Sequence, residues 1–370
     1  MIKVWDYLRE YHAEREEIEA AIREVMTSGM LILGANVRNF EAAFASYSGC
    51  KHGVGVNSGT DALFLALRAL GIGAGDEVIT VSNTAVPTVS AIQATGAQAR
   101  FVDIDARSYL MDTQLLDSAV TKRTRCILPV HLFGQCVDMD AVKSAAQRHG
   151  LHVIEDCAQA HGARNKGRVA GSMSELSAFS FYPTKILGGY GDGGMILSSS
   201  PELEAHCRRL RFYGMDKQYY SLEQGYNSRL DELHAAILLR KLAHLDDYIA
   251  RRRQLAELYY QELSDTDLVL PTVAENNFHA WYLFVCRHPH RDFILQYLKE
   301  RNIFLNISYP WPIHTMPAYA HLGYAQGDLP NTEAAAREIF SLPMFPSLSE
   351  DEALVTCQAL KDALAEAGSA

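Results

Sequence analysis

The stretch GVGVNSGTDALFLALRALGIGAGDEVITV, residues 53–81, sets the pattern from which the fold follows. The short apolar runs 53–56 and 77–81 have the length of buried strands, and residues 60–70 between them have the apolar spacing of a helix. A strand, a helix and a second strand in this order predict two parallel strands joined by a helical crossover.

The same alternation continues as far as residue 212. Strands that alternate with helices predict an α/β fold with a mostly parallel sheet between layers of helices. The further predicted strands are ARFVDI (99–104), RCILPV (125–130), LHVIED (151–156), SAFSF (177–181) and GGMILS (193–198), and the further predicted helices are 84–95, 138–149 and 201–212.

Two helices are predicted before the first strand. Residues 13–28 place Ile18, Ile22, Val25 and Met26 on one apolar stripe, and Gly29 ends the helix. The second helix follows Asn36; its apolar side chains are Val37, Phe40, Phe44 and Tyr47.

The C-terminal part has a different pattern. Residues 229–263 read as one long helix or two joined helices, and 281–287 as a strand followed by a helix over 291–301. Prolines in 305–319 exclude a regular helix there. We expect a domain boundary inside the long helix, which gives a large domain of residues 1–245 and a smaller α/β domain of residues 246–370.

Composition narrows the class of protein. Of the 370 residues 48% are hydrophobic and 21% are charged, which is enough apolar surface for a packed core. The net charge of −10 argues against nucleic-acid partners and anionic membranes, and no run approaches the ~20 apolar residues of a membrane helix. Seven dispersed cysteines without a C-x-x-C pair indicate reduced thiols in a cytoplasmic protein and predict no metal site.

Asp156 stands where the apolar strand LHVIED ends. In open α/β sheets ligands bind at the carboxyl ends of strands, so Asp156 and the nearby Gln159 and His161 are candidate site residues. The structural alternative is that Asp156 caps a helix that begins at Cys157.

Lys185 lies between the strand 177–181 and the glycine-rich run GGYGDGG. Most lysines are solvated surface groups, but glycines and aromatic residues around this one indicate a close approach of the backbone to a ligand. A desolvated lysine can act as an imine-forming nucleophile.

The turn Asn57-Ser58-Gly59-Thr60 joins the first strand to a helix predicted to start at about Asp61. Backbone N–H groups at such a helix start form a phosphate site. A plain N-cap by Thr60 or Asp61 is the alternative.

These three features together match the needs of pyridoxal 5'-phosphate. That cofactor requires an anchor for its phosphate, an anion beside its ring nitrogen, and an amine for its aldehyde. The sequence predicts all three on one parallel sheet.

The motifs EDCAQAHGA, FSFYPTK, GYGDGG and GYNSRLDELHAAIL extend the argument to a family. With them the chain resembles the DegT/DnrJ-type nucleotide-sugar aminotransferases, within the fold-type-I (aspartate aminotransferase) superfamily. The resemblance covers nearly the whole chain and implies a transaminase that uses pyridoxal phosphate and works as a homodimer with shared active sites.

The resemblance assigns roles to individual residues. Lys185 would hold the cofactor as a Schiff base and act as the catalytic acid and base; Asp156 would pair with the ring nitrogen and Gln159 with the phenolic oxygen. The phosphate would lie against Gly59, Thr60, Ser180 and, from the partner subunit, Asn227.

One position departs from the family pattern. The family has an aromatic residue that stacks on the cofactor ring where this chain has Ala85. Either a neighbouring side chain covers the cofactor ring, or that face of the ring is packed less tightly than is usual in the family.

The substrates follow from the same resemblance. L-Glutamate would donate the amino group and leave as 2-oxoglutarate. GYGDGG and GYNSRLDE resemble the group that acts at C-3 of a dTDP-linked 3-keto-6-deoxyhexose and gives a dTDP-3-amino-3,6-dideoxyhexose.

Substrate contacts are expected from the loop that carries Tyr309, His314 and Tyr319, and from His161, which is expected near the cofactor ring. For His314, a loop histidine bonded to backbone is the alternative. Amination at C-4 of a 4-keto-6-deoxyhexose is the second function that we consider. A sugar dehydratase or a regulatory homologue would lack the lysine or the aspartate, and both are present.

Overall fold

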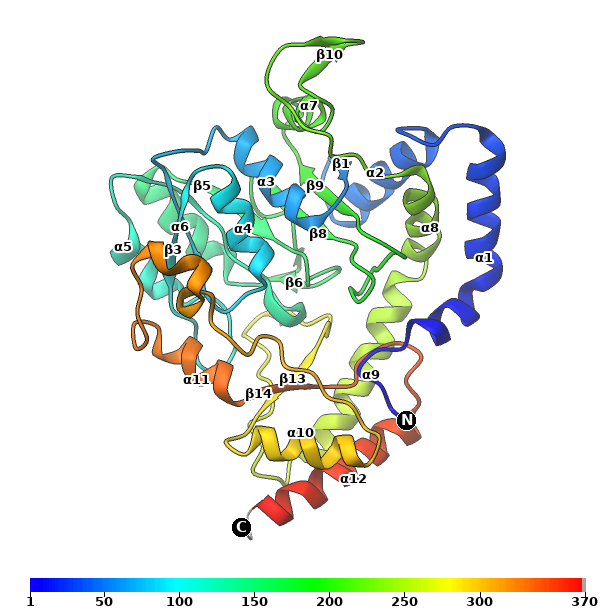
Figure 1. Cartoon of the computed structure of the whole chain (residues 1–370), viewed down its shortest axis with the longest axis vertical. Helices are drawn as coiled ribbons and strands as arrows, with labels where there is room; N and C mark the ends of the chain where they lie inside the picture. Colours follow the sequence, from blue (N-terminus) through cyan, green and yellow to red (C-terminus); the bar gives the residue numbers. More distant parts are fainter. Residues whose placement is uncertain (368–370) are drawn as a thin grey trace.

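A seven-stranded sheet forms the centre of the larger part of the molecule (Figure 1). The computed structural model describes residues 1–367. The strands are β1 (His52–Val56), β2 (Glu77–Val81), β3 (Gln98–Val102), β4 (Thr124–Ile127), β5 (His152–Asp156), β8 (Leu176–Ser180) and β9 (Gly194–Ser198). Their order is β1-β9-β8-β5-β4-β2-β3, and β9 alone of these seven runs antiparallel to its neighbours. The predicted mostly parallel sheet is confirmed.

Helices cover the sheet and explain its composition. All five residues of β2 are buried, as expected for a parallel strand covered on both faces. The helices that follow the strands are α3 (Gly59–Ala69), α4 (Val86–Ala94), α5 (Leu116–Ala119), α6 (Met139–His149) and α7 (Pro201–Leu210). The start predicted for α3 near Asp61 is wrong: the helix begins at Gly59, because the Ser58 side chain accepts the Asp61 N–H as its N-cap.

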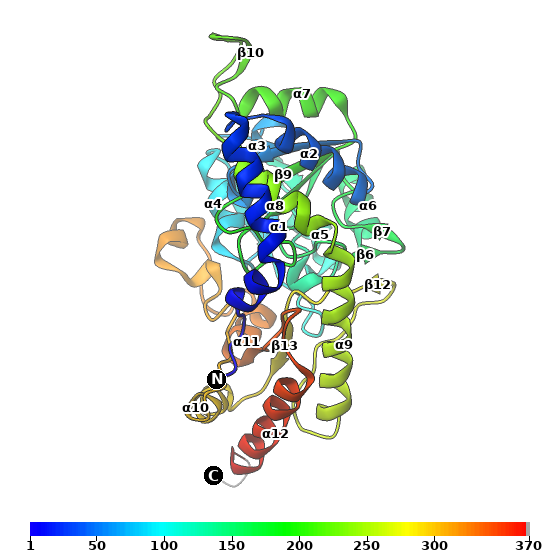
Figure 2. The ribbon, with the colours of Figure 1, turned by 90° about the vertical axis from the view of Figure 1, so that its right-hand side faces the viewer.

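The N-terminal helices α1 (Tyr7–Ser28) and α2 (Ala35–Tyr47) both pack on α8 (Glu232–Leu242) (Figure 2). The predicted apolar stripe of α1 divides into two parts. Ile18 and Val25 are buried, but Ile22 and Met26 are 38% and 61% exposed.

A smaller core lies at the other end of the molecule. Here α10 (Arg291–Glu300) and α12 (Glu350–Ala367) pack together beside the antiparallel pair β13 (Phe284–Arg287) and β14 (Ile339–Leu342), and α11 (Pro330–Glu338) precedes β14. The region 229–263 forms two joined helices, since α8 ends at Leu242 and α9 (Leu245–Leu263) begins after a short break. Ile2 and Trp5 also pack in this smaller core. The domain division at residue 245 stays a prediction.

Three shorter features complete the fold. The strands β6 (Arg164–Asn165), β7 (Arg168–Val169) and β12 (Asn277–Phe278) form a small sheet. The hairpin β10 (Met215–Lys217) and β11 (Tyr220–Ser221) projects from the top of the molecule (Figure 1). The proline-rich segment contains only short 3-10 turns at Ile313–Thr315 and Pro317–Leu322. Within residues 1–367, none of the helices has the length and apolar character needed to cross a membrane.

Candidate active site

A cavity of about 380 Å³ opens at the carboxyl ends of the parallel strands. Strand ends of one direction meet at a single edge of the sheet, which brings loops that are distant in sequence together. The cavity combines Asp156, Gln159 and Lys185 with the start of α3. Its lining residues are Ser58, Gly59, Thr60, Leu63, Thr84, Ala85, Pro87, Thr88, Val130, Asp156, Ala158, Gln159, Ser180, Tyr182, Thr184, Lys185, Asp192, Tyr282, Ser308 and Tyr309.

Asp156 is the last residue of β5 and is almost fully buried. Its Oδ1 accepts the backbone N–H of Ala158 at 3.1 Å, and its Oδ2 accepts the Thr88 hydroxyl at 2.8 Å. Burial raises the pKa of Asp156, while the Ala158 N–H, the Thr88 hydroxyl and the Lys185 charge oppose that rise. No helix starts at Cys157, so the alternative of a helix cap is wrong.

Lys185 follows β8 in a turn, where its N–H donates to the Tyr182 carbonyl at 2.9 Å. Its Nζ lies 4.6 Å from the centre of the Tyr282 ring. A cation over an aromatic face is stabilised by the ring quadrupole. The amine is therefore held in the cavity by an aromatic residue that the sequence did not single out.

Gln159 is fixed at both ends of its amide. Its Oε1 accepts the Phe133 N–H at 2.9 Å, and its Nε2 donates to the Tyr309 hydroxyl at 2.8 Å. Tyr309 is the one predicted sugar-contacting residue that lines the cavity.

The start of α3 passes very close to the end of β8. A Cβ added at Gly59 would lie 2.6 Å from the Cβ of Ser180, so only glycine fits there. Gly59, Thr60 and Ser180 thus border one corner of the cavity, beside the first free N–H groups of the helix.

Comparison with known proteins agrees with this geometry. Residues 12–361 match the model of the DegT/DnrJ/EryC1/StrS aminotransferase family. The chain belongs to this family.

Three individual proteins illustrate the likeness. The chain is 55% identical, over 94% of its length and 95% of the relative, to a dTDP-3-amino-3,4,6-trideoxy-alpha-D-glucose transaminase of Micromonospora megalomicea subsp. nigra. The crystal structure of S. venezuelae DesV in complex with a ketimine intermediate matches with a TM-score of 0.95 at 45% identity, over 96% of each chain. NtdA of Bacillus subtilis with bound cofactor PMP matches with a TM-score of 0.90 at 30% identity, over 95% of this chain and 82% of that one.

In this aminotransferase fold Ala85 lines the cavity as the N-cap of α4, and it makes no side-chain hydrogen bond there. The aromatic residues that do line the cavity are Tyr182, Tyr282 and Tyr309. All three come from other elements than α4, so an aromatic wall exists but not at the position expected from the family.

Four predicted residues do not line the cavity. Asn227 is exposed in its own chain. His161 is fully buried among Phe44, Phe179 and Phe181, and burial lowers its pKa to about 3. His161 does not line the cavity, and its expected contact with substrate stays a prediction.

The proline-rich loop holds the other two. His314 is buried, with Nδ1 2.8 Å from Ser82 Oγ and Nε2 3.1 Å from a Glu333 carboxylate oxygen. Tyr319 is paired with Ser90 through their hydroxyl groups at 3.0 Å. His314 thus ties the loop to the end of β2 and to α11, and Tyr319 ties it to α4. Neither side chain lines the cavity, and the expected sugar contact at each stays a prediction. The partners of His314 are side chains, not the backbone named in the alternative.

A cluster of possible metal ligands lies deeper in the protein. His131, Glu155 and Cys157 are buried and close together. Both ring nitrogens of His131 already have partners: Nδ1 accepts the Val137 N–H at 3.1 Å, and Nε2 is 2.9 Å from Glu155. This arrangement is that of a neutral histidine bonded to a carboxylate.

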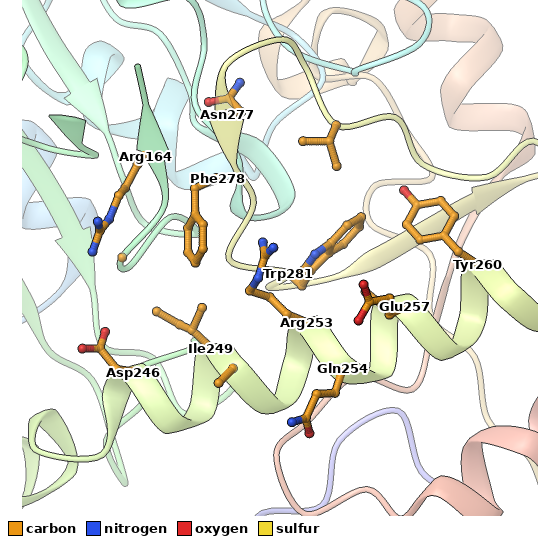
Figure 3. A pocket seen from close by; sticks show the side chains of 14 residues that line it. Arg164, Asp246, Ile249, Arg253, Gln254, Glu257, Tyr260, Asn277, Phe278 and Trp281 are labelled. Carbon is orange, nitrogen blue, oxygen red and sulfur yellow. The ribbon is translucent and has the colours of Figure 1, made fainter. Parts of the chain in front are cut away.

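A second, wider groove of about 670 Å³ runs along α9 (Figure 3). Arg164 and Arg253 flank Phe278 there, with guanidinium carbons 5.6 and 4.3 Å from the ring centre. None of the residues predicted for the site lines this groove, so its size alone does not make it the reaction centre.

Proposed function

We propose that this chain transfers the amino group of L-glutamate to C-3 of a dTDP-linked 3-keto-6-deoxyhexose, with pyridoxal phosphate as cofactor. The cavity that unites Lys185, Asp156 and the α3 start is the observation that carries this proposal. The 55% identical relative, a 3-amino-3,4,6-trideoxyglucose transaminase by name, supports position C-3 and makes a 4-deoxy sugar the first substrate to test.

The side chains present fit this cofactor. A carboxylate at one end of the cavity, an amine in its wall and a tight glycine corner at the α3 start match the ring nitrogen, the aldehyde and the phosphate. Pyridoxal phosphate supplies a ring that accepts the electron pair left when the donor carbon loses its proton.

The protein's own groups complete the chemistry. Lys185 Nζ would hold the cofactor at rest and, once the donor displaces it, would take the proton from the donor carbon as general base and give it, as general acid, to the cofactor carbon that carried the aldehyde. Ionised Asp156 favours a protonated ring nitrogen, since an opposite charge nearby stabilises the cation. Gln159 Nε2 faces the cavity beside Tyr309 and can donate to a phenolic oxygen.

The proposal includes a cytoplasmic homodimer. Asn227 is exposed and does not line the cavity of its own chain, which leaves it free to serve the cavity of a partner subunit, as the family resemblance implies. Exposed apolar side chains at the end of α1 and in the loop after it support a covered face. They are Ile22, Met26, Met30, Leu31 and Ile32.

The experiment is a coupled assay of 2-oxoglutarate release from L-glutamate with a dTDP-3-keto-6-deoxyhexose. We expect turnover by the wild type and none by Lys185→Ala. Turnover retained by Lys185→Ala contradicts the assignment. A fold check by circular dichroism distinguishes loss of the amine from loss of the structure.

A further inference from the structure

Two threonine side chains connect Asp156 to the start of α4, and the sequence motifs do not include either. Thr88 Oγ1 lies 2.8 Å from Asp156 Oδ2, and Thr84 Oγ1 lies 2.9 Å from Thr88 Oγ1. Both threonines are 2% exposed, and both line the cavity. The two hydroxyl groups and the carboxylate form one buried series of hydrogen bonds that ends at Asp156.

When Asp156 is ionised, the hydrogen bonds of this series can have only one donor-to-acceptor direction. A carboxylate only accepts hydrogen bonds, so the Thr88 hydroxyl proton must point to Asp156. That proton is then used, and Thr88 can bond to Thr84 only as an acceptor. The Thr84 hydroxyl therefore donates to Thr88, and Thr88 donates to Asp156.

The hydroxyl groups are not explained by helix capping. Ala85 is the N-cap of α4 and provides no side-chain hydrogen bond. Neither threonine bonds a free backbone N–H of the first turn among the hydrogen bonds of residues 1–367. Their hydroxyl groups serve the carboxylate instead.

Asp156 keeps capacity for another donor. An ionised carboxylate can accept about four hydrogen bonds, and Asp156 receives one from Ala158 and one from Thr88. A buried acid that lacks enough hydrogen-bond donors favours its protonated form. Each donor that bonds the carboxylate therefore stabilises the ionised form.

We propose that Thr88, oriented by Thr84, is a positioning residue that keeps Asp156 ionised and aimed at the cofactor ring nitrogen. The inference rests on the proposed role of Asp156. It assigns to this chain a two-hydroxyl support for the carboxylate directly beside Ala85.

The test measures cofactor affinity and compares two ligands. Apoprotein is titrated by equilibrium dialysis with pyridoxal phosphate and with its analogue in which carbon replaces the ring nitrogen. The analogue keeps the phosphate, the aldehyde and the phenol, so only the interaction with the ring nitrogen differs.

Thr88→Val removes the hydroxyl at nearly constant volume. We expect its affinity for pyridoxal phosphate to fall about tenfold or more, since a hydrogen bond to a charged group is lost, and its affinity for the analogue to stay unchanged. Thr88→Ser should restore the wild-type difference between the ligands. Thr84→Val should lower the affinity for pyridoxal phosphate about threefold, because Thr88 keeps its bond to Asp156 but loses its own donor.

Thr95→Val is the matched control. Thr95 is a buried threonine at the other end of α4, its hydroxyl donates to the Ile92 carbonyl, and it does not line the cavity. We expect no change for either ligand.

The outcomes separate the inference from the proposed function. Equal weakening of both ligands by Thr88→Val shows a purely structural role and overturns the inference, as does no weakening. Should Thr88→Val fail to fold, Thr84→Val decides by the same comparison of the two ligands: equal weakening of both, or no weakening, overturns the inference. Asp156→Asn tests the proposed role of Asp156 itself. If it weakens both ligands equally or neither, the assignment of Asp156 is wrong. If it weakens only pyridoxal phosphate while the threonine variants do not, only the inference fails.

Discussion

Glu155 and Asp156 are neighbours on β5, both are buried, and they have opposite surroundings. Glu155 accepts four hydrogen bonds, from His131 Nε2, Gly171 N, Met173 N and Ser174 Oγ. Asp156 accepts two and faces the cavity. Successive side chains of a strand point to opposite faces, so one carboxylate enters the protein's own network and the other remains available to a ligand.

The pKa values follow this difference. Burial raises the pKa of both acids, but for Glu155 the bonds to His131 and the other donors outweigh burial, and its pKa is lowered. For Asp156 burial dominates and the pKa is raised. A buried carboxylate with incomplete internal partners is the sign of a site, because a folded protein gains nothing from it without a ligand.

The largest expected effect is on stability. Glu155→Gln places an amide among groups that all donate, and we expect the free energy of unfolding to fall by about 3 to 5 kcal/mol. Asp156→Asn should cost less, about 1 kcal/mol, since the Asn oxygen still accepts from Thr88 and only the Ala158 N–H loses its acceptor. Guanidinium unfolding of the two apoproteins measures both, and equal losses would remove the distinction between the residues.

Activity should show the reverse order. We expect Asp156→Asn to lower kcat/KM at least about 100-fold, as for loss of one electrostatic group at a reacting centre. Glu155→Gln, assayed at a temperature where it is folded, should keep kcat/KM within about threefold of the wild type. A greater loss of activity in Glu155→Gln than in Asp156→Asn would show that the two roles are assigned to the wrong residues.

His314 extends the comparison to the proline-rich loop. Its two ring nitrogens have protein partners, as the oxygens of Glu155 do. His314→Ala should therefore cost about 1 to 3 kcal/mol of stability and leave the KM for the ketosugar unchanged. A raised KM with unchanged stability would instead support the sugar contact expected from the sequence.

The smallest effect is the pH dependence of the apoprotein's stability. The pKa of Glu155 is lower in the folded protein than its unfolded value of 4.5. Its contribution to stability is therefore complete above pH 4.5 and is lost as the pH falls through the folded pKa. A raised folded pKa means that ionised Asp156 weakens the fold at neutral pH, and that this penalty disappears as the pH falls toward 3.8. Acidification should thus shrink the stability difference between wild type and Glu155→Gln, and should raise the stability of the wild type relative to Asp156→Asn. Urea unfolding at several pH values checks both signs, and parallel shifts would contradict them.

The parts of the site that the sequence predicted lie where strands end. Asp156, Gln159 and Lys185 could be placed because an apolar run that stops at a polar residue is a local pattern. His314 could not, since its partner Ser82 is 232 residues away and only packing brings them together. Thr88 and Tyr282 were missed for the same reason, because nothing in their local sequence indicates a neighbour on another element.

The position of the new amino group tests the central claim most directly. The wild-type protein is incubated with L-glutamate and either the dTDP-3-keto-6-deoxyhexose or the dTDP-4-keto-6-deoxyglucose isomer, and each product is examined by NMR. A displacement of ~1 Å at the reacting atoms can cost about 100-fold in rate, so one carbon should be strongly preferred. We predict nitrogen on C-3 from the first sugar and little or no product from the second; efficient formation of a 4-amino sugar would contradict the account.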